Sequence, residues 1–219
     1  MTDFTVDFIP GSPFGRAVLA TLEEKGADYA FHPLTPQTFR APEYLKRNAF
    51  GRMPVFAHGD FRLYETQAIL RYLDRVIDEP TLTPADPQSA ARMDQLMSIN
   101  DWYLFAEVGR SIGFQRIILP RLLGGVADEA VVAAALPKAE ICYDEIDRLL
   151  GEQRFLAGEA LSLADLMIAP QMDLLTLAPE GEALVKARPR LAAWLARVIG
   201  RPSFKATTWE ALAALARAA

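Results

Sequence analysis

Three prolines within eight positions, at Pro80, Pro84 and Pro87, divide the 219-residue chain into two parts of different pattern. Proline lacks a backbone N–H and fixes φ, so this spacing interrupts regular structure and indicates a stiff linker. Strand patterns alternate with helix patterns before the linker, whereas the pattern after it is helical throughout. We therefore expect an α/β domain over residues 1–79, a linker over 80–87 and an all-helical domain over 88–219.

The first part contains local signals for both strands and helices. Residues 4–8 alternate large apolar with polar side chains, which predicts a half-buried strand. Ser12 followed by Pro13 is typical of a helix N-terminus, and the apolar stripe that follows ends at Lys25-Gly26. The later patterns predict a second strand, a short helix, a hairpin and an amphipathic helix, over residues 28–34, 42–45, 55–57 with 61–64, and 66–77. This order implies a central sheet with helices on its faces.

The second part shows helix patterns separated by glycine and proline. Ser162 and Asp165 fit a capping box that begins one of these helices. Pro137 lies inside another and implies a kink or a break. The predicted segments are 88–123, which ends at Gly124-Gly125, then 128–150, a helix from about 161, 189–199 and 204–217.

Charge and composition exclude several classes of partner. The net charge is −5, with −2 in residues 1–80 and −3 in the remainder, so no basic region invites nucleic acid or an anionic membrane. The longest apolar run, Ala130 to Leu136, has seven residues, whereas a membrane span needs about 20. One cysteine, Cys142, excludes an internal disulfide, and two scattered histidines argue against a metal. No secretory signal is visible at the first residues, so a reduced, cytoplasmic protein is expected.

A carboxylate and a hydroxyl stand together where a strand ends and a helix begins, at Glu65-Thr66. Unpaired N–H groups and the positive end of the helix dipole favour a carboxylate ligand at such a junction. Glu65 would bind the ammonium of a small zwitterion and Thr66 its carboxylate. Plain capping of the helix is the alternative. Pro54 lies upstream, in a loop before the predicted hairpin.

Several segments, taken in order, resemble the cytosolic glutathione S-transferase family, of the serine type and bacterial or phi/theta-like. The resemblance covers nearly the whole chain. It rests on Gly11-Ser12-Pro13-Phe14-Gly15-Arg16, Asn48-Ala49-Phe50-Gly51-Arg52-Met53-Pro54-Val55, Tyr64-Glu65-Thr66-Gln67-Ala68-Ile69, the Leu-Thr-Pro-Ala-Asp-Pro linker and the Ser162/Asp165 box.

The resemblance implies a thioredoxin-like N-terminal domain, βαβ-α-ββα, that binds glutathione. It also implies an all-helical C-terminal domain that lines the pocket of a small hydrophobic electrophile. A role in detoxification as a homodimer follows by the same resemblance, with glutathione as cosubstrate and no metal.

The resemblance also assigns the glutathione-binding residues. Pro54 would be cis and would direct the backbone N–H and C=O of Met53 at the cysteinyl part of glutathione. Glu65 and Thr66 would hold the γ-glutamyl end, with threonine replacing the more frequent serine. Arg52 would bind a carboxylate of glutathione or remain solvated.

Family members activate the thiol with a tyrosine, serine or cysteine after the first strand. Here the first tyrosine, Tyr29, lies at the second predicted strand, and no cysteine is near the loop. Ser12 remains, as a hydrogen-bond donor to the thiolate and not as a nucleophile. Helix capping alone also explains Ser12, and the two roles compete for one hydroxyl.

The site of the electrophile is indicated only by periodicity. Met93, Leu96, Met97, Leu104, Val108 and Ile112 form a plausible core stripe. Tyr103, Arg110 and Phe114 lie on another face, which borders either a substrate pocket or a partner subunit. The leading hypothesis is a glutathione transferase. The alternatives are a non-catalytic glutathione- or ligand-binding protein of the same fold and a glutathione-dependent peroxidase or isomerase.

Overall fold

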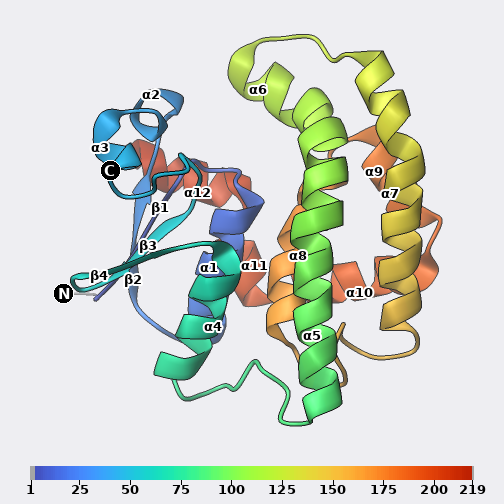
Figure 1. Cartoon of the computed structure of the whole chain (residues 1–219), viewed down its shortest axis with the longest axis horizontal. Coiled ribbons are helices and arrows are strands. Elements are labelled where there is room, and N and C mark those ends of the chain that lie inside the picture. Colours follow the sequence, from blue (N-terminus) through green and yellow to red (C-terminus); the bar gives the residue numbers. More distant parts are fainter. Residues whose placement is uncertain (1–2, 219) are drawn as a thin grey trace. The chain divides into compact units, whose positions relative to one another are not determined.

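The computed structural model describes residues 3–218 and divides the chain into two compact units (Figure 1). Unit 1 comprises the residues up to Leu82 together with those from Gly200 on, and unit 2 comprises Thr83–Ile199. The sequence pattern alone does not indicate that the end of the chain packs with unit 1.

A mixed sheet of four strands forms the centre of unit 1 within the described residues. The order is β2-β1-β3-β4; β1 runs parallel to β2 and antiparallel to β3, and β3 and β4 form an antiparallel hairpin. The strands are β1 (Phe4–Phe8), β2 (Tyr29–Pro33), β3 (Val55–His58) and β4 (Phe61–Tyr64). The predicted strands are thus confirmed.

Helices α1 (Pro13–Glu24) and α4 (Thr66–Val76) lie side by side against the sheet (Figure 1). A Cβ at Gly15 would lie 2.2 Å from the Phe8 ring, so only glycine lets α1 approach β1 this closely. The buried leucine and isoleucine side chains of both helices supply the core between them. The Ser-Pro signal and the apolar stripe predicted α1, and the amphipathic pattern over residues 66–77 predicted α4, both at nearly their observed bounds.

Four further helices lie in the described part of unit 1: α2 (Pro36–Phe39), α3 (Pro42–Leu45), α11 (Pro202–Ala206) and α12 (Trp209–Ala218). The sequence predicted α3 but not α2, and it predicted α11 and α12 as one helix. The two are separated at Thr207, whose hydroxyl donates to the Ser203 carbonyl.

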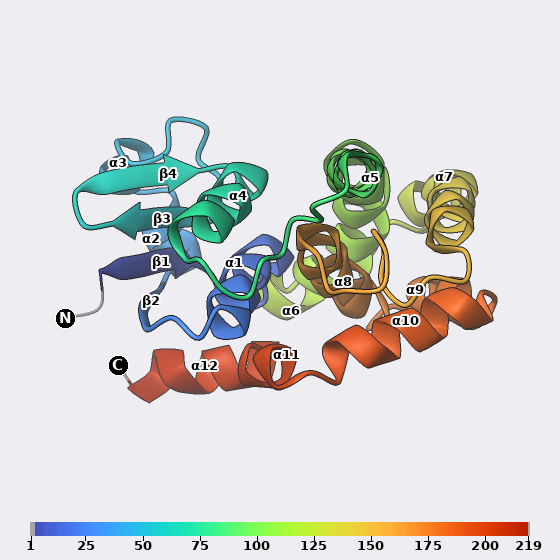
Figure 2. The ribbon, with the colours of Figure 1, turned by 90° about the horizontal axis from the view of Figure 1, so that it is seen from below.

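Helix α11 packs against α1 and leads into α12 (Figure 2). Arg201 pairs with Glu24 near the end of α1 at 2.6 Å, and the Phe204 carbonyl accepts from Arg16 at 3.1 Å. The guanidinium of Arg16 also lies 5.3 Å from the centre of the Phe204 ring. Arg16 therefore fastens α11 to α1.

Unit 2 is helical. Its first three helices follow one another without a break, as predicted for residues 88–123: α5 (Pro87–Ile99), the π-helix η1 (Asn100–Ile118) and α6 (Leu119–Leu123). The Leu119 N–H donates to the Phe114 carbonyl, five residues earlier, at the end of η1. Gly124, at φ +66°, ends α6. The predicted core stripe on α5 and η1, from Met93 to Ile112, is buried.

The remaining helices of unit 2 are α7 (Glu129–Leu150), α8 (Leu163–Leu175), α9 (Pro179–Lys186) and α10 (Pro189–Ile199). Helix α7 continues through Pro137 without a break, and α9 was not predicted. The capping box at Ser162 and Asp165 is confirmed.

Asp165 is the buried polar centre of unit 2. It is fully buried and accepts hydrogen bonds from the Leu156 N–H at 2.9 Å, from the Ser162 N–H and hydroxyl at 2.8 and 2.7 Å, and from the Trp194 indole at 2.7 Å. Burial raises the pKa of Asp165, although these donors oppose the effect. The network joins the start of α8 to α10 and to the preceding loop.

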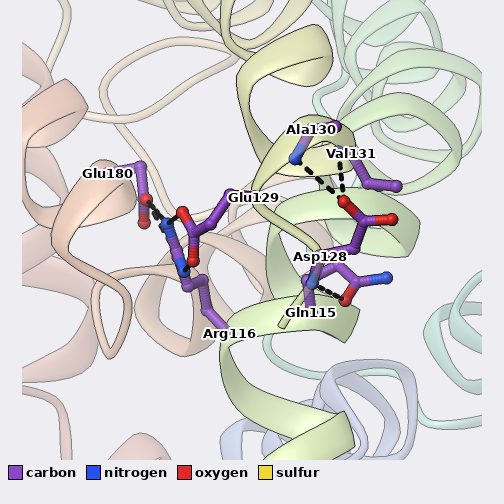
Figure 3. A network of polar contacts seen from close by, with 7 residues as sticks. All are labelled: Gln115, Arg116, Asp128, Glu129, Ala130, Val131 and Glu180. Atoms are coloured by element: carbon purple, nitrogen blue, oxygen red, sulfur yellow. Dashed lines mark hydrogen bonds and ion pairs between the residues drawn. The ribbon is translucent and has the colours of Figure 1, made fainter. Parts of the chain in front are cut away.

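An arginine in η1 joins the first turns of two later helices (Figure 3). Arg116 donates to both carboxylate oxygens of Glu129 at 2.5 and 2.7 Å, and to Glu180 at 2.6 and 2.9 Å. Beside it, the Gln115 side chain accepts from the N–H of Asp128, which caps α7. Hydrogen bonds from Arg116 lower the pKa values of Glu129 and Glu180.

Across residues 3–218, no helix is both long and apolar enough to cross a membrane.

Candidate glutathione site

Ser12 occupies the N-cap of α1, as the sequence predicted. Its backbone is extended, at φ −69° and ψ 118°, and its hydroxyl oxygen accepts from the Gly15 N–H at 3.3 Å. Capping uses only a lone pair of this oxygen, so the O–H proton remains available to a ligand. The two roles that the sequence left in competition are therefore chemically compatible.

The environment of Ser12 favours donation to an anion. The hydroxyl lies at the positive end of the dipole of the 12-residue helix α1. A hydroxyl that accepts one hydrogen bond is polarised and becomes a better donor in another. The arrangement therefore suits a thiolate placed beside the Ser12 oxygen.

Glu65 has an unusual backbone conformation at the start of α4. Its φ of 69° is the one positive φ of a non-glycine residue within the described part of the chain. Such a conformation costs on the order of 1–3 kcal/mol and tends to occur at functional sites. The side chain is exposed and makes no capping hydrogen bond, so its carboxylate is accessible to a cationic ligand group.

Thr66 is the first residue of α4 and is mostly buried, at 6% exposure. Its backbone N–H is one of the donors that a helix N-terminus leaves without an intrahelical partner. Neighbouring Glu65 and Thr66 thus present an anion and a group of donors within one turn. This pair of features matches the ammonium and carboxylate of an amino acid.

The loop before β3 holds the third group of predicted residues. The Met53–Pro54 peptide is cis, as the resemblance implied, and Pro54 is buried. Arg52 is exposed, and its carbonyl accepts from the Tyr44 hydroxyl at 2.7 Å and from the Asn48 amide at 2.9 Å. The Met53 sulfur accepts weakly from the Ile9 N–H, just after β1, at 3.4 Å.

The sequence did not identify Tyr44 or Asn48 as part of this site. Asn48 lies in the loop segment 48–55 that carries the family resemblance, and Tyr44 lies in the short helix predicted over residues 42–45. Neither pattern indicates that the side chain donates to a backbone carbonyl. Ser12, the Met53–Pro54 loop and Glu65-Thr66 all belong to unit 1.

The three residues suggested for the electrophile lie in unit 2, on η1. Tyr103, Arg110 and Phe114 are exposed, and Phe114 is the least so at 36%. Buried positions on this helix recur four residues apart at Leu104, Val108 and Ile112, so the exposed side chains occupy a different face.

Two other kinds of functional group are relevant here: a reactive cysteine and a cluster of metal ligands. Cys142 is 5% exposed in α7, and burial raises the pKa of its thiol to about 12, so it is a core residue. The described residues contain no group of three or more His, Cys, Asp or Glu side chains arranged to hold a metal.

A thioredoxin-like sheet domain with a cis-proline loop, followed by a helical unit, defines a class of thiol-binding proteins. Comparisons identify the family within this class. Residues 4–75 match the family profile "Glutathione S-transferase, N-terminal domain", and residues 129–197 match "Glutathione S-transferase, C-terminal domain".

Relatives and solved structures agree with these matches. A glutathione S-transferase of Hyoscyamus muticus is 32% identical over 197 residues, which cover 88% of this chain and 92% of the relative. Glutathione transferase F7 from Populus trichocarpa superposes with a TM-score of 0.84 at 25% identity, over 93% of this chain and 97% of that one. A glutathione S-transferase-I solved with lactoylglutathione has a TM-score of 0.82 at 29% identity, over 94% and 98% of the two chains.

The chain belongs to the glutathione S-transferase family, as its motifs predicted. It is therefore a transferase with glutathione as cosubstrate.

Proposed function

We propose that this transferase activates the glutathione thiol through the hydroxyl of Ser12 and adds it to a small apolar electrophile. The observation that carries the proposal is the position of Ser12 at the N-cap of α1, where its oxygen accepts from Gly15 and its proton is free to donate. An ordinary cysteine thiol has a pKa of about 8.5, so only a few per cent is thiolate at pH 7. Hydrogen bonding to the thiolate, aided by the helix dipole, increases that fraction.

The other predicted site residues of unit 1 bind the parts of glutathione that surround the thiol. Glu65 binds the γ-glutamyl ammonium, and the hydroxyl and N–H of Thr66 bind its carboxylate. The Met53–Pro54 backbone pairs with the cysteinyl residue, and Arg52 binds the glycyl carboxylate. The strained backbone of Glu65 and the exposed guanidinium of Arg52 support these assignments.

The proposed contact surface for the electrophile lies in unit 2. Tyr103, Arg110 and Phe114 form the proposed contact surface for the apolar electrophile, because their face of η1 combines aromatic groups with a cation. The structure bound to lactoylglutathione shows a relative of similar fold with a glutathione conjugate. We further propose a cytoplasmic homodimer without a metal cofactor.

A titration of the bound thiol tests the role of Ser12. Ultraviolet absorbance of the thiolate measures the pKa of the thiol of glutathione bound to the wild-type protein. We expect a value of about 6.5 to 7.5, below the ordinary value of about 8.5, in line with a charge-assisted hydrogen bond. Ser12→Ala should return the pKa close to 8.5 and lower kcat with a chlorodinitrobenzene-type acceptor about tenfold or more, whereas Ser12→Thr should retain most of the effect.

Thr35→Ala is the matched control, because Thr35 caps α2 through its hydroxyl in the same unit. It should leave the thiol pKa unchanged. Conjugation that is equally fast in Ser12→Ala would refute the assignment of Ser12. Glutathione binding without a thiolate signal in the wild-type protein would instead favour a non-catalytic binding protein.

A further inference from the structure

Two side chains from the segment before the cis-proline loop converge on one backbone carbonyl. The Tyr44 hydroxyl donates to the Arg52 oxygen at 2.7 Å, and the Asn48 amide donates to the same oxygen at 2.9 Å. A carbonyl oxygen has two lone pairs, so these donors satisfy it completely. The orientation of the Arg52 C=O bond is therefore fixed from two directions.

The same two contacts set the direction of the next N–H group. The Arg52–Met53 peptide is planar and trans, so its C=O and N–H point in opposite directions. With the carbonyl turned toward Tyr44 and Asn48, the Met53 N–H is directed away from them. Within residues 3–218 this N–H donates to no protein acceptor.

The two donors are themselves anchored. Asn48 is 1% exposed, and its side-chain oxygen accepts from the Phe50 N–H at 3.0 Å, which fixes the amide orientation. The Tyr44 ring packs against Phe39, with centroids 5.5 Å apart. Both donors therefore have little freedom to leave the Arg52 carbonyl.

The anchoring continues to the centre of the sheet. Arg47, between Tyr44 and Asn48, forms an ion pair with Asp7, which is buried on β1 at 2% exposure. Asp7 also contacts His32 of β2 at 3.2 Å. The ion pair of Arg47 thus ties residues 44–48 to the sheet, and the hydrogen bonds of Tyr44 and Asn48 tie the cis-proline loop to the same residues.

Tyr44 keeps its proton at neutral pH. Burial and the nearby Asp7 carboxylate raise the pKa of the Tyr44 phenol to about 12. The phenol therefore remains a donor to the Arg52 carbonyl at neutral pH.

We propose that Tyr44 and Asn48 are positioning residues, which orient the Arg52–Met53 peptide so that the Met53 N–H meets the cysteinyl carbonyl of glutathione. The inference rests on the proposed function and names a determinant of glutathione affinity that is separate from thiol activation. Neither side chain needs to touch the ligand.

Tyr44→Phe tests the inference with minimal change, since the ring and its packing remain. The KM for glutathione should rise about two- to tenfold, in line with the loss of one neutral hydrogen bond. The kcat at saturating glutathione, the KM for the electrophile and the pKa of the bound thiol should stay unchanged, because Ser12 lies in a different loop.

Tyr29→Phe is the control, since it removes a tyrosine hydroxyl of the same unit that donates to Glu23 and not to the loop. Its kinetics should equal those of the wild type. Asn48→Ala should raise the KM for glutathione in the same selective way.

Three results would overturn the inference. An unchanged KM for glutathione in both Tyr44→Phe and Asn48→Ala would refute it while leaving the role of Ser12 intact. A fall in kcat that parallels a fall in melting temperature would assign both residues a purely structural role. Wild-type protein that binds no glutathione in calorimetry would refute the proposed function, and the inference with it.

Discussion

The indole ring of Trp209 occupies the space into which a side chain at Gly11 would point. A Cβ at Gly11 would lie 2.6 Å from Trp209 Cε2, and the backbone there has a φ of +97°. Gly11 immediately precedes Ser12. The last helix of the chain therefore packs against the loop that carries the proposed thiol-activating hydroxyl.

Gly11→Ala should reduce both stability and activity. A non-glycine residue at positive φ costs on the order of 1–3 kcal/mol, and here the Trp209 ring must also move. We expect a loss in the free energy of unfolding beyond that range, measured by urea titration, and a lower kcat because the Ser12 loop shifts.

Gly26→Ala separates the two causes of this loss. Gly26 has a φ of +62°, but a Cβ there would meet nothing within 4 Å, so only the conformational cost applies. Combining Gly11→Ala with Trp209→Ala should recover part of the loss in a double-mutant cycle. Equal losses at Gly11 and Gly26 would contradict the steric argument.

The contact of Glu24 with α11 should make unit 1 sensitive to acid. Burial alone would raise the pKa of Glu24, but hydrogen bonds from Arg201 and Ser203 hold it below its ordinary value of 4.5. Because the folded pKa is lowered, the stabilisation is present above pH 4.5 and is lost as the pH falls through the folded pKa.

Glu24→Gln should therefore lower the melting temperature at pH 7, and the difference from wild type should shrink as the pH falls below 4.5. Asp60→Asn, in the exposed turn between β3 and β4, is the control and should change little at either pH. A difference that stays constant with pH would show that the carboxylate charge does not contribute.

Much of the fold was predictable because its signals are local. The alternation in residues 4–8 predicts β1 at its observed bounds, and the Ser12-Pro13 start with the stop at Lys25-Gly26 predicts α1 at nearly its observed bounds. The break between α11 and α12 was missed because the helical periodicity continues through Thr207, whereas the Thr207 backbone, at φ −111° and ψ 23°, leaves the helical conformation there.

The residue types of the candidate site were predictable from the sequence. The backbone conformation and the hydrogen bonds that position these residues were not. Glutamate carries no sequence signal for a positive φ, so the conformation of Glu65 could not be foreseen. The hydrogen bonds from Tyr44 and Asn48 end on a backbone carbonyl, which has no residue identity to recognise. Such contacts depend on tertiary geometry and leave no periodic pattern.

Arg116 should contribute more to the stability of unit 2 than a surface arginine ordinarily does. Its side chain is 21% exposed and bridges two helix starts. Arg148 is 68% exposed, and within residues 3–218 its one ion pair is with Glu145 of the same helix, α7. Arg116→Met should lower the melting temperature more than Arg148→Met does. The difference in melting temperature between the two variants should become smaller at 1 M salt, because screening weakens the ion pairs. Equal melting temperatures at low salt would refute the bridging role.

Trp194→Phe should destabilise unit 2 by about 2–4 kcal/mol, because it leaves a cavity and removes a donor from a buried carboxylate. Trp194 is fully buried, and its indole donates to Asp165 at 2.7 Å. Trp102→Phe is the matched control: Trp102 is 72% exposed, so its loss should fall within about 0.5 kcal/mol. Urea unfolding of Trp194→Phe, Asp165→Asn and the double variant gives the coupling between the two side chains. If the two side chains interact directly, the double variant should lose an amount of unfolding free energy that differs from the sum of the losses in the two single variants. Strict additivity would mean that Trp194 stabilises α10 by packing alone.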